Sequence, residues 1–174
     1  ATDSVADVWT NYVAVNHLKD EVNTGGANKE NREVEGSKGD GKDSWNSLSM
    51  NTANPGTSAN DEITITTNSD AFNYDYTVDW GDDSTSENVT GDITHTYVSV
   101  GLYTVTISGD FPQLYFPPNT ENDDGNVVRH SDAAKLTSVE QWGTNRWRSM
   151  YRAFADCSNL VSNAIDIPDL SQVS

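Results

Sequence analysis

The sequence predicts a mainly β fold whose centre is a small antiparallel sandwich. Apolar and polar residues alternate with a period of two in residues 63–66, 72–80 and 103–108, which is typical of strands with one buried face. Turn-forming residues separate these stretches, at Asn54-Pro55-Gly56, Gly81-Asp82-Asp83 and Val100-Gly101. Short strands joined by regular turns indicate a sandwich.

Composition divides the 174 residues into the blocks 1–43, 44–111 and 112–174. The first block opens with residues 8–18, an aromatic and β-branched run that predicts a strand. Residues 23–43 are rich in Gly, Asn, Lys and Glu and carry almost nothing apolar, which predicts a flexible polar linker. A single strand and a linker cannot form a core of their own.

The second block, residues 44–111, holds the predicted sandwich. One predicted strand presents large apolar side chains on a single face: Phe72, Tyr74, Tyr76, Val78 and Trp80. Trp80 ends this face, so we expect it to anchor the core of the sandwich.

Three motifs follow one another in this block: the turn Trp80-Gly81-Asp82-Asp83, the triplet His95-Thr96-Tyr97, and the strand-like run 101–109. Together they resemble the PKD family of immunoglobulin-like sandwiches. Asp83 stands where the family usually has Gly, and Asp accepts the left-handed backbone conformation better than most residues. The resemblance implies an extracellular, non-catalytic spacer or binding module.

The third block carries, from residue 136 onward, a series of short motifs: Trp147, Ser149-Met150, Ala153-Phe154, Cys157-Ser158-Asn159-Leu160 and Pro168-Asp169-Leu170-Ser171. In this order they resemble the BspA-type leucine-rich repeats of bacterial surface proteins. It implies the first unit of a leucine-rich-repeat solenoid, a fold in which stacked repeats bury one another's faces. Trp147, Met150, Tyr151 and Phe154 follow the spacing i, i+3, i+4, i+7, which predicts a short helix with one buried face.

Charge and composition exclude several classes of function. The chain has 27 acidic and 10 basic side chains and a formal net charge of -17, which argues against binding the phosphates of nucleic acid. No stretch approaches the ~20 apolar residues of a membrane span. We expect no catalytic, cofactor-binding or metal-binding residues, because no nucleophile–base pair, metal cluster or phosphate loop is recognisable and Cys157 is the single cysteine.

Acidic turns leave calcium as an alternative. Asp79, Asp82 and Asp83 cluster at one turn, and residues 121–125 form a second polar loop. Calcium takes several carboxylate and carbonyl oxygens, but Asp and Asn also favour turns because their side chains bond nearby backbone amides. We favour turn chemistry at both places. His95 is interpreted as a structural residue bonded across a turn, since no nucleophile partner is recognisable.

Basic residues and the cysteine of the third block have structural interpretations. Arg146, Arg148 and Arg152 fit a solvated helix face, and the alternative is a docking patch for an acidic neighbour or surface polymer. Cys157 is expected to pack as a small hydrophobe inside the repeat.

These observations predict a non-enzymatic, exported protein of the bacterial cell surface that adheres to or recognises a protein or glycan. The chain begins at Ala1 without Met, which indicates a trimmed product of an extracellular protein. One alternative is a structural subunit of an extracellular filament or layer, assembled by donating the strand at residues 8–18 to a neighbouring copy. The other is an accessory module of a secreted glycan-active enzyme, because the same residues resemble the opening strand of laminin-G sandwiches.

Overall fold

The computed structural model describes residues 45–174. The predicted strand at 8–18 and the predicted linker at 23–43 lie outside the described residues. The strands are β1 (Asn46–Asn51), β2 (Glu62–Ile65), β3 (Asp75–Asp79), β4 (Thr85–Val89), β5 (Ile93–Thr96), β6 (Leu102–Asp110), β7 (Thr120–Glu121), β8 (Val127–Val128), β9 (Leu136–Gln141) and β10 (Val161–Ser162). A single 3-10 turn, η2 (Ala133–Lys135), is the helical element within these described residues.

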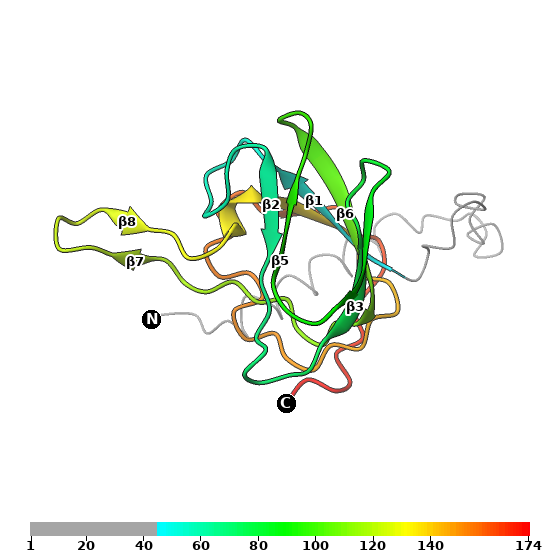
Figure 1. Cartoon of the computed structure of the whole chain (residues 1–174). Helices are drawn as coiled ribbons and strands as arrows, with labels where there is room; N and C mark the ends of the chain where they lie inside the picture. Colours follow the sequence, from blue (N-terminus) through cyan, green and yellow to red (C-terminus); the bar gives the residue numbers. More distant parts are fainter. Residues whose placement is uncertain (1–44) are drawn as a thin grey trace, which may run out of the picture. The chain divides into compact units, whose positions relative to one another are not determined.

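The mainly β, sandwich-like fold is confirmed. The larger sheet has the strand order β10-β9-β1-β6-β3-β4, and β2 pairs with β5 in a second sheet of two strands (Figure 1). Alternate residues of β2 and β3 are buried, as the period-two pattern predicts, whereas in β6 Thr106 is buried along with Val105 and Ile107 on either side of it. The buried hydrophobic side chains of these strands are Ile63, Ile65, Tyr76, Val78, Val105 and Ile107.

The predicted apolar face of residues 72–80 is confirmed over most of its length. Tyr74, Tyr76, Val78 and Trp80 are buried, and Phe72, which precedes β3, is half-buried. Trp80 is 1% exposed, and its indole Nε1 donates a hydrogen bond to Ser86 Oγ at 3.0 Å. The predicted core position of Trp80 is therefore correct.

The strand β9 ties the predicted third block to the sandwich. It pairs antiparallel with β1, where Leu48 lies opposite Val139 and Met50 opposite Leu136. All four of these side chains are buried. Apolar residues that the sequence analysis assigned to a separate repeat thus complete the core beside β1. No leucine-rich-repeat solenoid is seen in residues 45–174.

A parallel pairing with a constant offset follows β9. Val161 in β10 pairs with Ser138 and Ser162 with Val139, both in parallel. An isolated parallel bridge joins Asp169 to Arg146. Each pair is separated by the same 23 residues, from 138 to 161, 139 to 162 and 146 to 169. The chain from residue 161 onward therefore runs parallel to the chain from residue 138 onward, with a constant offset of 23 residues.

The predicted helix at 147–154 is wrong. The segment consists of turns, with hydrogen bonds from Ala153 N to Met150 O and from Cys157 N to Phe154 O. Arg152 has a φ of 55°, a left-handed conformation that an α-helix cannot contain. Trp147 and Met150 are buried as the spacing predicted, but Tyr151 is 59% exposed.

A buried polar cluster around η2 fixes the loop between β1 and β2. The Lys135 ammonium, fully buried, donates to Ser58 Oγ, Ala59 O and Glu62 O at 2.7, 2.7 and 2.8 Å. The neighbouring Asp132 carboxylate accepts hydrogen bonds from backbone amides of the same loop, at 2.9 Å from Thr57. Burial lowers the pKa of Lys135, while nearby carboxylates oppose that shift. Buried charges whose hydrogen bonds are satisfied in this way hold a loop without regular structure in one conformation.

The two-stranded sheet β7–β8 is a hairpin that stands away from the other two sheets (Figure 1). All of residues 120–130 are exposed. Within residues 45–174, no helix is long and apolar enough to cross a membrane.

Candidate functional site

The acidic turn after β3 uses its carboxylates to hold the backbone. Asp79 Oδ1 accepts a hydrogen bond from Gly81 N at 2.9 Å, and Asp82 Oδ1 accepts one from Ser84 N at 3.2 Å. Asp83 takes the left-handed conformation, with a φ of 69°, at the place where the resemblance implied Gly. These contacts belong to the turn chemistry that Asp favours.

His95 joins this turn to the aromatic core. Its Nε2 lies 2.9 Å from Asp82 Oδ2, and its ring stacks on Trp80 with 4.8 Å between centroids. Burial alone raises the pKa of Asp82, but hydrogen bonds from Ser84 and His95 outweigh burial and leave that pKa below its usual value. His95 therefore connects the acidic turn to the buried core, which is a structural role.

The second acidic loop is the turn of the β7–β8 hairpin. Asn122 Oδ1 accepts hydrogen bonds from Asp124 N at 3.1 Å and from Asn126 N at 2.8 Å. Gly125 has a φ of 78°, as a tight hairpin turn requires. Across the described part of the chain, no three His, Cys, Asp or Glu side chains gather as a group that could hold a metal ion.

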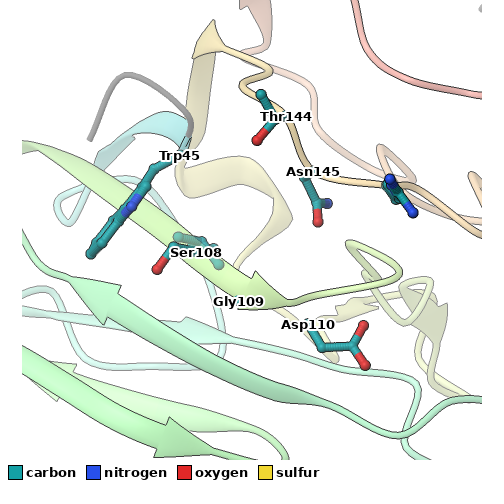
Figure 2. A pocket seen from close by; sticks show the side chains of 8 residues that line it. Trp45, Ser108, Gly109, Asp110, Thr144 and Asn145 are labelled. Carbon is teal, nitrogen blue, oxygen red and sulfur yellow. The ribbon is translucent and has the colours of Figure 1, made fainter. Parts of the chain in front are cut away.

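A pocket of about 350 Å³ opens between the sandwich and the third block. Its lining comes from the start of β1, the end of β6 and the loop after β9: Trp45, Ile107, Ser108, Gly109, Asp110, Thr144, Asn145 and Arg146. Figure 2 shows the Trp45 ring beside Ser108, with Asn145 and Asp110 further along. An aromatic ring on one side and several polar groups around it are features of ligand sites.

The sheet wall of this pocket follows from strand pairing. Asn46 lies opposite Ile107, so Trp45, one residue earlier, lies opposite Ser108. Asp110 is two residues beyond Ser108 and shares its face of β6. These side chains therefore stand on the outer face of the sheet, while Ile107 points to the core and is 1% exposed.

The loop wall of the pocket is held by acidic residues from the next turn of the chain. Asp166 accepts hydrogen bonds from Trp142 N at 3.0 Å and from Gly143 N at 2.8 Å. Trp147 N donates to Asp169 O at 3.3 Å. Asn145 Nδ2 donates to Phe111 O at 2.9 Å, which leaves its amide oxygen as the free acceptor of that side chain. Both walls are thus fixed before any ligand arrives.

The three arginines of the third block have separate settings rather than one helix face. Arg146 lines the pocket and is exposed. Arg148 is exposed, and its backbone N donates to Pro112 O at 2.9 Å. The Arg152 guanidinium lies 5.1 Å from the centre of the Tyr151 ring. Of these three arginines, Arg146 is the one that lines this pocket.

Cys157 is half-buried in the turns that replace the predicted helix. Burial, together with the nearby Asp156, raises the pKa of its thiol to about 12. A thiol with so high a pKa stays protonated and is a poor nucleophile or metal ligand at neutral pH.

Sequence reasoning named Arg146 but missed the other polar residues of the pocket. Ser108 entered the prediction only as the polar partner in an alternating strand. Trp45, Asp110 and Asn145 belong to none of the motifs that the sequence analysis identified. The strand register that brings Trp45 opposite Ser108 joins positions far apart in the chain, and no local pattern reveals it.

Comparison with known proteins supports the resemblance found in the middle block. Residues 47–110 match the PKD domain family. No curated protein and no solved structure matches the chain. The match runs from β1 to the end of β6. It does not include the loop at residues 144–146, which forms the other wall of the pocket.

Proposed function

We propose that this chain is a non-enzymatic, exported protein of the bacterial cell surface whose role is to recognise a protein or glycan. PKD domains are typical of extracellular and cell-surface proteins, and residues 47–110 match that family. The observation that carries the recognition role is the pocket between β6 and the loop at 144–146. Its walls are held by backbone pairing and by Asp166, so binding would cost little ordering entropy.

A non-enzymatic role agrees with the chemistry of the titratable groups. Asp82 and His95 are engaged with each other at 2.9 Å, and the Trp80 ring covers one face of the imidazole. Cys157 has a raised pKa. Asp110, the pocket carboxylate, has Arg146 rather than a second acid among the residues that line the pocket with it. Hydrolysis of a glycoside commonly uses two carboxylates that face one bond.

We also propose that residues 136–174 are a first leucine-rich-repeat-type turn attached to the edge of the sandwich. The constant offset of 23 residues in the parallel pairs supports this proposal, because leucine-rich repeats run from about 20 to 29 residues. The apolar side chains Val161, Ile165 and Ile167 are 59%, 95% and 69% exposed. Exposed apolar side chains beside a parallel strand suit the packing of a further turn.

The proposed function is tested by presenting the labelled chain to bacterial cells, host cells and extracellular matrix. Saturable binding that is reduced by Arg146→Ala and kept by Arg148→Ala would support recognition through the pocket, since both arginines are exposed but only Arg146 lines it. Binding to none of these surfaces would overturn the proposal.

Two other results would replace this proposal with one of the alternatives. Polymers that grow with protein concentration and vanish on deletion of residues 1–20 would favour the filament subunit. Turnover of a glycan by a longer parent protein carrying a catalytic domain would favour the accessory module.

A further inference from the structure

The groups around the pocket combine hydrogen-bond donors, acceptors and an aromatic ring. The hydroxyl of Ser108 can both donate and accept, and the amide oxygen of Asn145 can accept. Asp110 accepts through its carboxylate, and Arg146 donates through its guanidinium. A ligand rich in hydroxyl groups matches such a mixed set, because each hydroxyl can donate to one neighbour and accept from another.

We propose that this pocket binds a neutral saccharide, with one pyranose ring lying against the Trp45 indole. This inference rests on the proposed recognition function and names the ligand class of the same site. One face of a pyranose carries mainly C–H groups and its rim carries hydroxyls. An indole supplies a flat apolar surface against which the C–H face of the sugar can pack. The polar residues around the pocket can form hydrogen bonds with the hydroxyls of its rim.

The charges of the site favour a neutral ligand. Asp110 and Arg146 line the same pocket with opposite charges. Asp75 lies opposite Asp110 across the β3–β6 pairing, and the whole chain has a net charge of -17. An anionic ligand therefore meets general repulsion, and a cationic ligand meets Arg146.

A carboxylate lies near Arg146 in the next turn of the chain. Asp169 pairs with Arg146 through the backbone in the parallel bridge. Hydrogen bonds from Ser171, with a smaller contribution from the charge of Arg146, lower the pKa of Asp169. The positive charge of Arg146 therefore has a negative charge near it on its own chain, which reduces its attraction for an anionic ligand.

The size of the pocket agrees with a short saccharide. Its volume of about 350 Å³ lies at the lower end of the range for small-molecule sites, roughly 300–1,000 Å³. An extended peptide is usually bound along a strand edge or a long groove. The pocket instead lies on the outer face of β6, whose two edges are already paired with β1 and β3.

The experiment applies the full chain to an array of neutral, acidic and amino sugars and measures the affinity of each hit by calorimetry. We expect neutral glycans to bind with an affinity that changes little with salt, because no net charge is neutralised. Trp45→Ala should weaken binding roughly tenfold or more, whereas Trp45→Phe should keep most of it. Asp110→Ala should also weaken binding.

Tyr151→Ala is the matched control, because Tyr151 is an exposed aromatic residue outside the pocket. It should leave the affinity unchanged. Thermal unfolding of each variant separates a lost contact from a lost fold. If Trp45→Ala fails to fold, Asp110→Ala and Ser108→Ala carry the test, since both positions are on the outer face of β6.

Several outcomes would overturn the saccharide inference. These are the absence of any neutral glycan hit, binding that Asp110→Ala and Trp45→Ala both leave intact, and binding confined to acidic sugars with a steep salt dependence. If the chain still binds cells through a protease-sensitive partner, the saccharide inference fails while the recognition function stands. If it binds no cell or matrix, the recognition function itself fails.

Discussion

The backbone of Gly56 lies against the carboxylate of Asp132. A Cβ atom on Gly56 would stand 2.2 Å from Asp132 Oδ1 and 2.9 Å from Lys135 Cε. The same Oδ1 accepts hydrogen bonds from Thr57 N at 2.9 Å and Ser58 N at 3.0 Å, so it cannot retreat without breaking both.

We therefore expect Gly56→Ala to lower the free energy of unfolding by about 1–3 kcal/mol, through overpacking and loss of buried hydrogen bonds. Chemical denaturation measures the change. Gly91→Ala is the control, because a Cβ there would meet only Ser69 Oγ at an ordinary 3.9 Å. Equal effects of the two substitutions would show that the Asp132 contact is not what requires glycine.

Trp80 is expected to be among the most costly core residues to remove. Trp80→Ala should lower the free energy of unfolding by ~3–5 kcal/mol, because it empties a buried site that also holds the stacked His95. Val98→Ala, at a fully exposed side chain, should change stability very little. An unchanged thermal midpoint for Trp80→Ala would contradict the assigned core.

Asn46 offers a stabilising substitution. Its side chain is 1% exposed, and neither amide atom has a hydrogen-bond partner. A buried polar group without a partner costs free energy, so Asn46→Val should raise the free energy of unfolding by about 1 kcal/mol. Asn46→Asp should do the opposite because it buries a charge. Destabilisation by both would indicate that the amide has an undetected role.

Asp82 should make stability depend on acid pH. Its pKa is lower in the folded chain than the usual 3.8, so its stabilising contribution is complete above that value and is lost as pH falls through the folded pKa. The difference in thermal midpoint between the wild-type chain and Asp82→Asn should therefore shrink as pH falls from about 5 to about 2. A difference that stays constant over this range would argue against the Ser84 and His95 hydrogen bonds.

Chelation should have little effect on stability. Asp79 and Asp82 already accept hydrogen bonds from Gly81 N, Ser84 N and His95. We expect a chelator to shift the thermal midpoint by less than about 2 °C in differential scanning calorimetry. A larger drop, reversed by added calcium, would show that these carboxylates coordinate a cation.

The sequence predicted those parts of the fold that depend on neighbouring residues. The alternation around Tyr76 and Val78 identifies a strand and its buried face, because each side chain alternates with the pleat. The turn at Asp83 could be anticipated because Asp is one of the few residues other than Gly that accept a positive φ.

The remaining elements depend on contacts between distant residues. Leu136 and Val139 fit a separate unit as well as the sandwich sheet, and only their pairing with Met50 and Leu48 shows that they join that sheet. The apolar spacing of Trp147 and Met150 suits a helix, but the left-handed Arg152 prevents one. For the same reason the pocket was missed, since three separate segments meet to form it.

The position of β1 has a consequence for how this protein can be divided. The PKD match ends at residue 110, yet β1 lies between β6 and β9, and β9 begins at Leu136. A protease cut or a gene fusion at residue 110 would remove β9 and turn β1 from an interior strand into an edge. Leu48 and Met50 would lose Val139 and Leu136, their cross-strand partners in β9, and an uncovered strand edge promotes aggregation. The segment that sequence comparison identifies is therefore shorter than the stretch of chain that supplies its main sheet.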